Sequence, residues 1–221
     1  MPGITFRLYV IGAGLAGVAA VAAAAIEWRI GDPAALLGYL VLTLVASAVK
    51  ARIPGLTGSV SLGFVAVLAG VASMSLTETV LGVTGAAIGQ TLWRAGQRPR
   101  AVQMFFNMSV LAASTWVAYT VAYAFAPESS WLRIVVAVAP LYLLNVGAVA
   151  GVLSLVSTGG LDAIWQKFQF AVFPCYLVGA ALAILITEAR IGQQAWAAIT
   201  PLLGLSYLTF NSYRSWMRRL A

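Results

Sequence analysis

The sequence predicts an all-α, polytopic integral membrane protein. It forms a single helical domain over residues 1–221 with about eight apolar segments and both termini in the cytoplasm. The chain is 62% hydrophobic and only 9% charged, with a mean hydropathy of +0.94. A water-soluble domain of this length could not bury so much apolar surface. Apolar segments follow one another without a polar stretch long enough for a soluble domain, so we expect a multi-pass protein of the cell (inner) membrane, in contact with its lipids.

The first apolar segment runs from about Leu8 to Ile26. It contains the pattern Gly12-x-Gly14-x-x-Gly17, which matches the dinucleotide-binding fingerprint. That fingerprint works where a strand feeds a helix N-terminus and a second strand ends in an acidic residue, whereas Asp32 lies in a polar turn. The pattern therefore indicates a small-residue face on a membrane helix. The residues that recur on this face at every fourth position are Gly12, Ala16, Ala20 and Ala24.

The centre of the predicted bundle is a short helical hairpin. The segments Ser59–Met74 and Thr79–Trp93 are joined by the turn Ser75–Glu78 and followed by the basic loop Arg94–Arg100. Each segment reaches about 24 Å, against a hydrocarbon core of about 30 Å. The hairpin therefore either stands upright in a thinned or protein-lined part of the bilayer, or is re-entrant. Small residues in its second segment allow neighbouring backbones to approach closely. They are Gly82, Gly85, Ala86 and Gly89.

Longer apolar segments complete the predicted bundle. Pro33 is placed to start the second of them, because proline is favoured in the first turn of a helix. A loop, Ser157–Lys167, precedes the seventh. Besides the first segment and the hairpin, the predicted segments are Ala34–Val49, Ala101–Ala126, Trp131–Val156, Phe168–Thr187 and Ala195–Tyr213.

Loop charge orients the predicted bundle, because Lys and Arg near helix ends stay in the cytoplasm. If the N-terminus is inside, most basic residues fall in inner loops and most acidic residues in outer ones, and a re-entrant hairpin leaves this parity unchanged. The inner basic residues are Arg7, Lys50, Arg52, Arg94, Arg98, Arg100, Lys167, Arg214, Arg218 and Arg219; the outer ones are Arg29, Arg133 and Arg190. The net charge of +7 is thus a topology signal and a contact with anionic lipids, and we predict no nucleic-acid partner.

The residue inventory argues against an enzyme. The sequence has no histidine, which removes the commonest general base and metal ligand. Its single cysteine, Cys175, lies in an apolar run and is expected to be a packed thiol. No paired membrane carboxylates, Ser–His–Asp set or metal-ligand cluster is recognisable in the sequence. We therefore predict no catalytic residue, no cofactor and no metal.

Amide side chains inside the apolar segments are the main candidates for a ligand site, because a polar group in a bilayer needs a partner or a function. Gln103 and Asn107 are four residues apart and share a helical face. With Gln90 they would lie in the cytoplasmic third, and Asn145 lies near the middle of the sixth segment. Two alternatives stay open: the amides link helices by hydrogen bonds, or they line a ligand pocket between helices. On the second alternative, we predict that Gln90, Asn107 and Asn145 line the pocket.

Two further candidates are Glu78 and Trp116. Glu78 is the only acid of the central hairpin, and is either a solvated loop charge or a contact to a ligand or ion. Trp116 forms a stripe with Tyr119 and Tyr123, which fits an interfacial aromatic belt or helix packing on one interpretation and a stacking surface for a flat ligand on the other. Separately, Gly147-x-x-x-Gly151 is a close-packing face, and a homodimer through it is one alternative.

Several short sequence runs, taken in their order along the chain, resemble the N-terminal membrane domain found ahead of HD-GYP phosphohydrolases and GGDEF diguanylate cyclases. The resemblance covers most of the chain and rests on order and spacing. The features are the run Ser59–Phe64, the glycine-rich segment Gly82–Gln90, the loop Arg94–Arg100, Phe105–Asn107, Tyr142–Asn145, the Gly-Gly loop with Trp165, and Tyr213–Arg214. That domain in turn looks like the S components of energy-coupling-factor vitamin transporters, which bind a vitamin between helices and dock a partner through small residues such as Ala16, Ala20 and Ala24.

The resemblance implies a membrane sensor. A small molecule or lipid bound in the bundle would shift the last helix and so signal to a cytoplasmic output domain, although the given chain ends at Ala221. An S-component-like substrate-binding subunit of a transporter is the alternative, with a transporter partner in place of the output domain. A ligand-free structural membrane protein is a further alternative.

Overall fold

The computed structural model describes residues 3–52, 59–92, 101–156 and 160–188, together with 207, 208 and 211. Helices account for nearly all of this part of the chain. They are α1 (Ile4–Ile26), α2 (Pro33–Ala48), α3 (Gly63–Ser73), α4 (Leu76–Leu92), α5 (Ala101–Phe125), α6 (Ser130–Val156) and α7 (Leu161–Thr187). Two short antiparallel strands, β1 (Lys50–Arg52) and β2 (Ser59–Ser61), follow α2 and precede α3. The predicted all-α class is confirmed for these residues, apart from this small strand pair.

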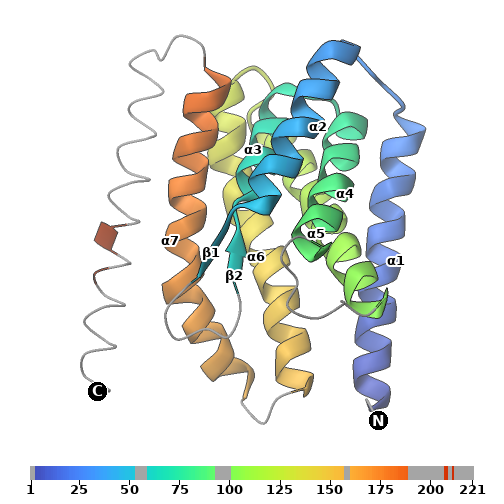
Figure 1. Cartoon of the computed structure of the whole chain (residues 1–221), viewed down its shortest axis with the longest axis vertical. Helices are drawn as coiled ribbons and strands as arrows, with labels where there is room; N and C mark the ends of the chain where they lie inside the picture. Colours follow the sequence, from blue (N-terminus) through green and yellow to red (C-terminus); the bar gives the residue numbers. More distant parts are fainter. Residues whose placement is uncertain are drawn as a thin grey trace.

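Consecutive helices run in opposite directions, so the bundle has two ends (Figure 1). We call the end at which α1 begins the lower end, and the end at which α1 passes into α2 the upper end. The α3–α4 turn, the α5–α6 loop and the end of α7 also lie at the upper end (Figure 1).

Helix α3 is the centre of the bundle. Every residue from Gly63 to Ala72 is buried, because α2, α4, α6 and α7 pack around it. The hydrophobic core follows from this arrangement and combines apolar side chains of α3 with those of α5, α6 and α7. For α3, the prediction that a short hairpin segment is enclosed by longer helices is confirmed.

The predicted start of the hairpin was wrong. The sequence predicts that Ser59–Ser61 belongs to an apolar helical segment, but these residues form β2, which pairs with Lys50–Arg52 in the register Lys50 to Ser61. The hairpin turn was also placed too late, since α4 begins at Leu76 and not at Thr79. The cause is a capping interaction between Ser75 and Glu78, described below, which starts the helix three residues earlier.

The predicted start of the seventh segment was wrong too. Helix α7 begins at Leu161, within the predicted loop, and not at Phe168. Hydropathy marks only the apolar part of a helix, and the first turns of α7, at the lower end of the bundle, mix apolar residues with polar ones such as Asp162 and Gln166. The basic loop Arg94–Arg100 lies outside the described residues, as does the predicted segment Ala195–Tyr213 except at residues 207, 208 and 211.

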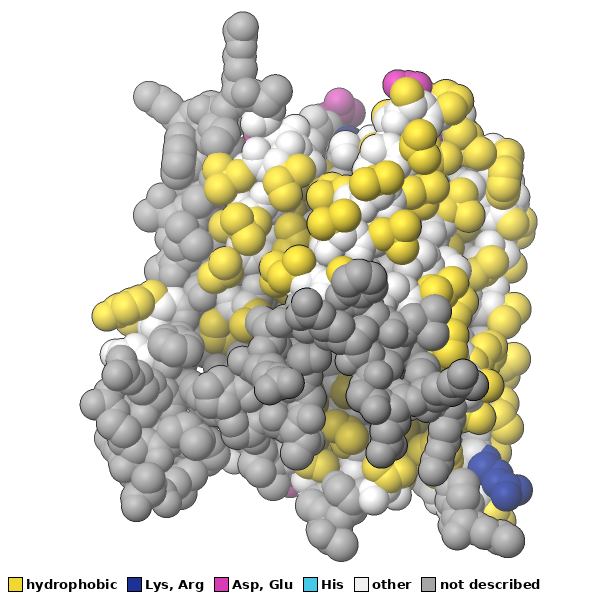
Figure 2. All heavy atoms as spheres, in the orientation of Figure 1, with side chains coloured by type: hydrophobic (Ala, Val, Ile, Leu, Met, Phe, Trp, Pro, Cys, Tyr) yellow, Lys and Arg dark blue, Asp and Glu magenta, His cyan; other side chains and the backbone are white. Residues whose placement is uncertain are grey.

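Three of the described helices, α1, α5 and α6, are long and apolar enough to cross a membrane. Figure 2 shows hydrophobic side chains spread over the described surface of the molecule. On α1 the outward-facing ones are large, and each is about half or more exposed. They are Ile4, Leu8, Ile11, Leu15 and Val18. Such a surface belongs in lipid rather than in water, which agrees with the predicted membrane protein.

Charge differs between the two ends. Five acidic residues occupy loops and helix ends at the upper end of the bundle; they are Glu27, Asp32, Glu78, Glu128 and Glu188. Arg7 lies near the start of α1 at the lower end, and β1, which continues α2 in that direction, carries Lys50 and Arg52 (Figure 1). Most of the acidic side chains visible in Figure 2 lie at the upper end, and a basic group lies at the lower end.

Helix α1 packs on α5 through glycines. A Cβ atom on Gly14 would lie 2.6 Å from the ring of Phe105, and one on Gly17 would lie 2.5 Å from the Cα atom of Ser109. All three fingerprint glycines therefore lie inside a helix, and Gly14 and Gly17 allow close packing, whereas a Cβ atom on Gly12 would meet nothing within 4 Å. The small residues predicted to share one side of this helix differ in burial. Ala20 and Ala24 are buried, but Gly12 and Ala16 are exposed, because a four-residue spacing drifts by about 40° per step around a helix of 3.6 residues per turn.

Helix α2 packs equally closely on the central hairpin. The buried ring of Tyr39 fills a notch between Gly70 and Gly82, where added Cβ atoms would approach it to 2.2 and 2.3 Å. About two helical turns after Tyr39 on α2, Ser47 lies against Gly89. A Cβ atom added to Gly89 would come within 2.5 Å of the Ser47 hydroxyl. The prediction of close packing at glycines of the second hairpin segment is confirmed for Gly82 and Gly89, which contact side chains of α2, whereas Gly85 has only an ordinary contact.

Candidate functional site

A cavity of about 140 Å³ lies between α3, α6 and α7, closed by β2 and the end of α4. It contains two of the amides singled out from the sequence, and its other walls are mainly aromatic and aliphatic. The lining residues are Ser61, Phe64, Gln90, Asn145, Val146, Val149, Phe168, Val172 and Tyr176. We call it the amide cavity.

Ser61 shapes one wall of the amide cavity. Its hydroxyl donates to the backbone carbonyl of Ser47 at 2.9 Å and accepts from the backbone N–H of Gly63 at 3.1 Å. These bonds stabilise the turn from β2 into α3, where the backbone groups are paired neither by the strand pair nor by the helix. The turn fixes the start of α3 and so places Phe64, one residue into the helix, at the cavity.

Asn145 and Tyr176 form the polar centre of the amide cavity. Asn145 Nδ2 donates to the Tyr176 hydroxyl oxygen at 2.8 Å. The ring of Phe64 stacks on that of Tyr176 with centroids 4.3 Å apart and planes at 12°. Gly179 makes room for this stack, because a Cβ atom there would lie 2.1 Å from the Phe64 ring. Since the Tyr176 oxygen accepts the bond from Asn145, its own hydrogen and the Asn145 carbonyl oxygen can each serve another partner.

An aromatic cluster supports this centre from behind. Tyr142 contacts Tyr176 and Phe173 edge to face, with centroids 5.3 and 5.0 Å apart, and Trp165 lies 6.1 Å away. Tyr142 is 3% exposed, and its hydroxyl has no hydrogen-bond partner among the described residues. The cluster therefore packs against Tyr176, and within the described part of the chain the Tyr142 hydroxyl is buried without a hydrogen bond.

The predicted amides separate into two groups. Gln90 and Asn145 line the amide cavity, and both are half-buried. Asn107 is half-buried and Gln103 exposed on α5, and neither is among the residues that line the cavity. Trp116 packs instead beside a small cluster of Ala24, Leu76 and Val80 near the upper end.

Glu78 has a structural role at the upper end of the bundle. Its carboxylate accepts 2.9 Å hydrogen bonds from the backbone N–H groups of Ser75 and Gly31, and it shares the single hydroxyl hydrogen of Ser75 with the Arg29 carbonyl. The Ser75 hydroxyl in turn accepts from the Glu78 N–H at 3.3 Å, which makes a reciprocal capping box at the start of α4. Glu78 is 4% exposed, so the prediction of a solvated loop charge is wrong.

The capping box also joins the α1–α2 loop to α4. Besides the bond from Gly31, Ser75 donates to the carbonyl of Arg29 at 2.6 Å, and Thr77 donates to that of Ala24 at 2.8 Å. Burial desolvates the Glu78 carboxyl, which by itself would raise its pKa, but the bonds from Ser75 and Gly31 outweigh this effect and hold the pKa below its ordinary value. The ionised carboxylate therefore holds the α1–α2 loop against the start of α4.

Arg133 is a structural residue that the sequence analysis missed. Its guanidinium donates to the Ala72 carbonyl at 2.9 Å and to the Tyr123 hydroxyl at 3.1 Å, and it lies 4.2 Å from the centre of the Tyr123 ring. Further bonds reach the carbonyls of Ala126 and Pro127. It thus caps the ends of α3 and α5, which lack partners for their last carbonyls. In the sequence, a cation beside a helix end and an aromatic stripe indicates such a role, which loop charge alone does not.

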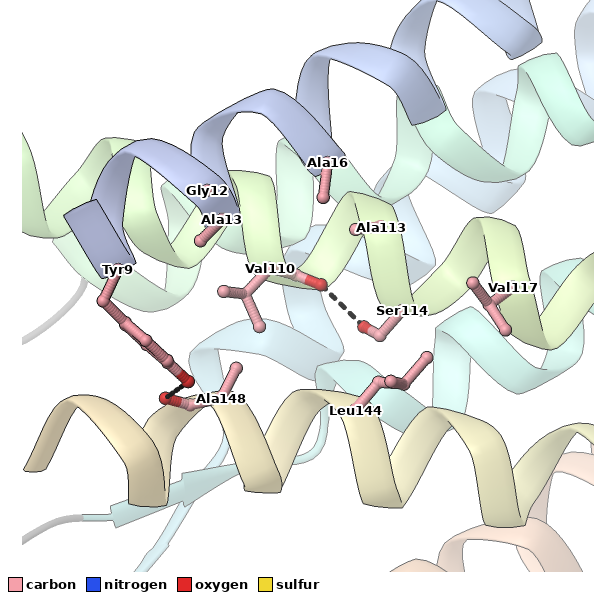
Figure 3. Close-up of a pocket in the computed structure, with 10 residues that line it drawn as sticks. All are labelled: Tyr9, Gly12, Ala13, Ala16, Val110, Ala113, Ser114, Val117, Leu144 and Ala148. Atoms are coloured by element: carbon pink, nitrogen blue, oxygen red, sulfur yellow. Dashed lines mark hydrogen bonds between the residues drawn. The ribbon is translucent and has the colours of Figure 1, made fainter. Parts of the chain in front are cut away.

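A second hollow lies on the side of the bundle between α1, α5 and α6, with a volume of about 410 Å³ (Figure 3). Small side chains make most of its wall, so we call it the apolar groove. It is lined by Tyr9, Gly12, Ala13, Ala16, Val110, Ala113, Ser114, Val117, Leu144 and Ala148. None of the residues predicted as ligand contacts is among them.

Within the described residues, no group of three or more Cys, Asp or Glu side chains is arranged to hold a metal ion. Comparisons with models of known protein families, with curated proteins and with solved structures find no match for this chain. The site must therefore be interpreted from its own geometry.

Proposed function

We propose that this chain is a non-enzymatic integral membrane domain that binds a small neutral molecule in the amide cavity and signals its presence to a cytoplasmic output. The observation that carries the proposal is the convergence of Gln90 and Asn145 with Tyr176 on one cavity inside the bundle. Asn145 also links α6 to α7 through its bond to Tyr176, as the first alternative predicts, but both Asn145 and Gln90 line the same cavity. A molecule there could use the Asn145 carbonyl, the Tyr176 hydroxyl and the Gln90 amide together.

The chemistry of the lining restricts the ligand. The cavity has no charged lining residue among those described, so a charged ligand would be desolvated without a counter-ion. Phe64, Phe168 and Val172 offer apolar contact to the rest of the molecule. We therefore propose a small uncharged compound with adjacent donor and acceptor groups on a flat or apolar body.

The proposed signal passes through α7. This helix contributes Phe168, Val172 and Tyr176 to the cavity wall, and it is the last long helix described before the C-terminal part of the chain. A ligand that bridges Asn145 on α6 and Tyr176 on α7 would change how these helices sit against each other. A two-state shift of this kind requires only that the ligand bind one arrangement better than the other.

We further propose that the domain has about eight apolar segments in the inner membrane, with both termini cytoplasmic. The separation of acidic residues at the upper end from Arg7 and β1 towards the lower end supports this orientation. The S-component-like alternative receives less support, because Ala20 and Ala24 of the proposed docking pattern are buried within the bundle.

A thermal-shift screen of the detergent-solubilised protein tests the proposal. Neutral aromatic amides, with benzamide as the reference and benzoate as its charged counterpart, should raise the melting temperature only in the neutral form. Gln90→Leu should abolish the shift, and Asn107→Leu, an amide change outside the cavity, should retain it. If no neutral compound is sensitive to Gln90→Leu, or if Asn107→Leu abolishes the same shifts, the amide cavity is not the binding site.

A further inference from the structure

We propose that the apolar groove holds one acyl chain of an anionic phospholipid drawn from the leaflet at the lower end of the bundle. This site is distinct from the amide cavity. From the proposed function, the inference takes only the placement of the domain in a membrane. It would make a bound lipid part of the folded domain.

The helices around the apolar groove place it at the depth of the hydrocarbon core. Its walls come from α1, α5 and α6, the three described helices that are long and apolar enough to cross a membrane. The groove extends from Tyr9 to Ala16 on α1 and from Val110 to Val117 on α5, which is about 10 Å along each axis at 1.5 Å per residue. Its long direction is therefore that of the helices and of the acyl chains in a leaflet (Figure 3).

The polar atoms of the groove are already satisfied within the protein. The Tyr9 hydroxyl donates to the Ala148 carbonyl at 3.0 Å, and the Ser114 hydroxyl donates to the Val110 carbonyl at 2.8 Å (Figure 3). A polar ligand would lose its hydrogen bonds to water without replacement. An acyl chain loses none, and it supplies the dispersion contacts that an unfilled hollow between Ala and Gly side chains lacks.

The end at which the groove begins favours an anionic headgroup. Tyr9 lies two residues after Arg7, in the second turn of α1. The lower end of α1 carries this arginine, whereas the upper end of the bundle is mainly acidic among the described residues. Basic residues at a membrane surface attract anionic lipids. A tyrosine at this level also fits the interfacial position that its ring and hydroxyl prefer.

Native mass spectrometry of the detergent-solubilised protein tests the inference, with phosphatidylglycerol and phosphatidylcholine of identical chains added in series. Ala16→Leu fills the groove from an exposed position, and Ala19→Leu makes the same change on the exposed face of α1 outside it. The fraction of protein that retains one phosphatidylglycerol molecule should be at least fivefold higher for wild type and for Ala19→Leu than for Ala16→Leu. Arg7→Gln should remove the preference for phosphatidylglycerol over phosphatidylcholine.

Ala113→Leu, which fills the groove from α5, repeats the test if Ala16→Leu lowers the melting temperature. Equal lipid retention in the groove-filling variants and Ala19→Leu would overturn the acyl-chain site, and equal retention of both lipids by wild type would overturn the anionic headgroup. Conversion of a dimer to a monomer by Ala16→Leu, with lipid retention unchanged, would assign the groove to a second copy of the chain. Loss of ligand shifts in the thermal screen leaves these outcomes unaffected, so the two proposals fail separately.

Discussion

Replacement of Glu78 by alanine should remove the connection between the α1–α2 loop and the central hairpin. The backbone N–H groups of Ser75 and Gly31 each donate a 2.9 Å hydrogen bond to this carboxylate, which also shares the Ser75 hydroxyl hydrogen with the Arg29 carbonyl. A hydrogen bond to a charged group contributes about 1.5–3 kcal/mol, and loss of a helix cap costs about 0.5–2 kcal/mol. Because water can reach part of the opened loop, we expect the free energy of unfolding to fall by about 3 kcal/mol, roughly a hundredfold in the ratio of folded to unfolded protein.

The matched control is Glu128→Ala, which removes an exposed carboxylate at the same end of the bundle and should change the free energy of unfolding by less than about 0.5 kcal/mol. Both variants can be compared with wild type by denaturant titration in a fixed detergent, with far-UV circular dichroism as the signal. Equal losses of stability in the two variants would refute the assignment of Glu78 as a structural capping residue.

The same carboxylate predicts a pH dependence. Its folded-state pKa lies below the ordinary value of 4.5, so the ionised form stabilises the fold above that pH, and the contribution is lost as the pH falls through the folded-state pKa. The stability difference between wild type and Glu78→Gln should therefore be constant from pH 7 to about 5 and should shrink below that. A difference that grows on acidification would contradict the capping geometry.

Three other substitutions test the packing, each by thermal or denaturant unfolding in detergent. Tyr39→Phe should leave stability unchanged or raise it by up to about 1 kcal/mol, because the buried hydroxyl has no partner among the described residues; a clear loss would reveal one. Gly17→Leu should cost about 3 kcal/mol or more, since the new side chain would meet the backbone of Ser109. Arg133→Met should cost about 2 kcal/mol by freeing carbonyls such as that of Ala72, and no loss would show that water replaces the guanidinium.

Much of the fold could be predicted because long apolar segments leave few alternatives to helices. The fifth segment was predicted as Ala101–Ala126 and is Ala101–Phe125, and Pro33 starts α2 with Asp32 as its N-cap, as the local chemistry requires. The strand β1 could not be predicted, since Lys50–Arg52 is short and polar. Its extended conformation goes with its pairing to β2, which the residues of β1 alone do not indicate.

The candidate site was predicted less completely. Helical spacing identifies residues that share a face, but not the neighbour that the face meets. Asn107 and Gln103 share a face of α5 that does not reach the amide cavity, whereas Asn145 meets Tyr176 from the next helix. Tyr176 itself was overlooked, because an aromatic residue in an apolar run looks like ordinary core until a polar partner is found opposite it.

The strand pair helps to explain how so short a central hairpin can belong to a membrane bundle. Helix α3 has 11 residues and extends for about 17 Å, but β2 continues it by about 10 Å, and β1 continues α2 in the same way. Non-helical backbone at membrane depth must satisfy its polar groups within the protein. Here the two strands bond to each other, the Leu62 N–H donates to the Val49 carbonyl at 3.0 Å, and Ser61 bonds both flanking segments. In this arrangement β2 prolongs α3, the first arm of the hairpin, and β1 prolongs the neighbouring helix α2, while Ser61, which lines the amide cavity, lies at the junction of β2 and α3.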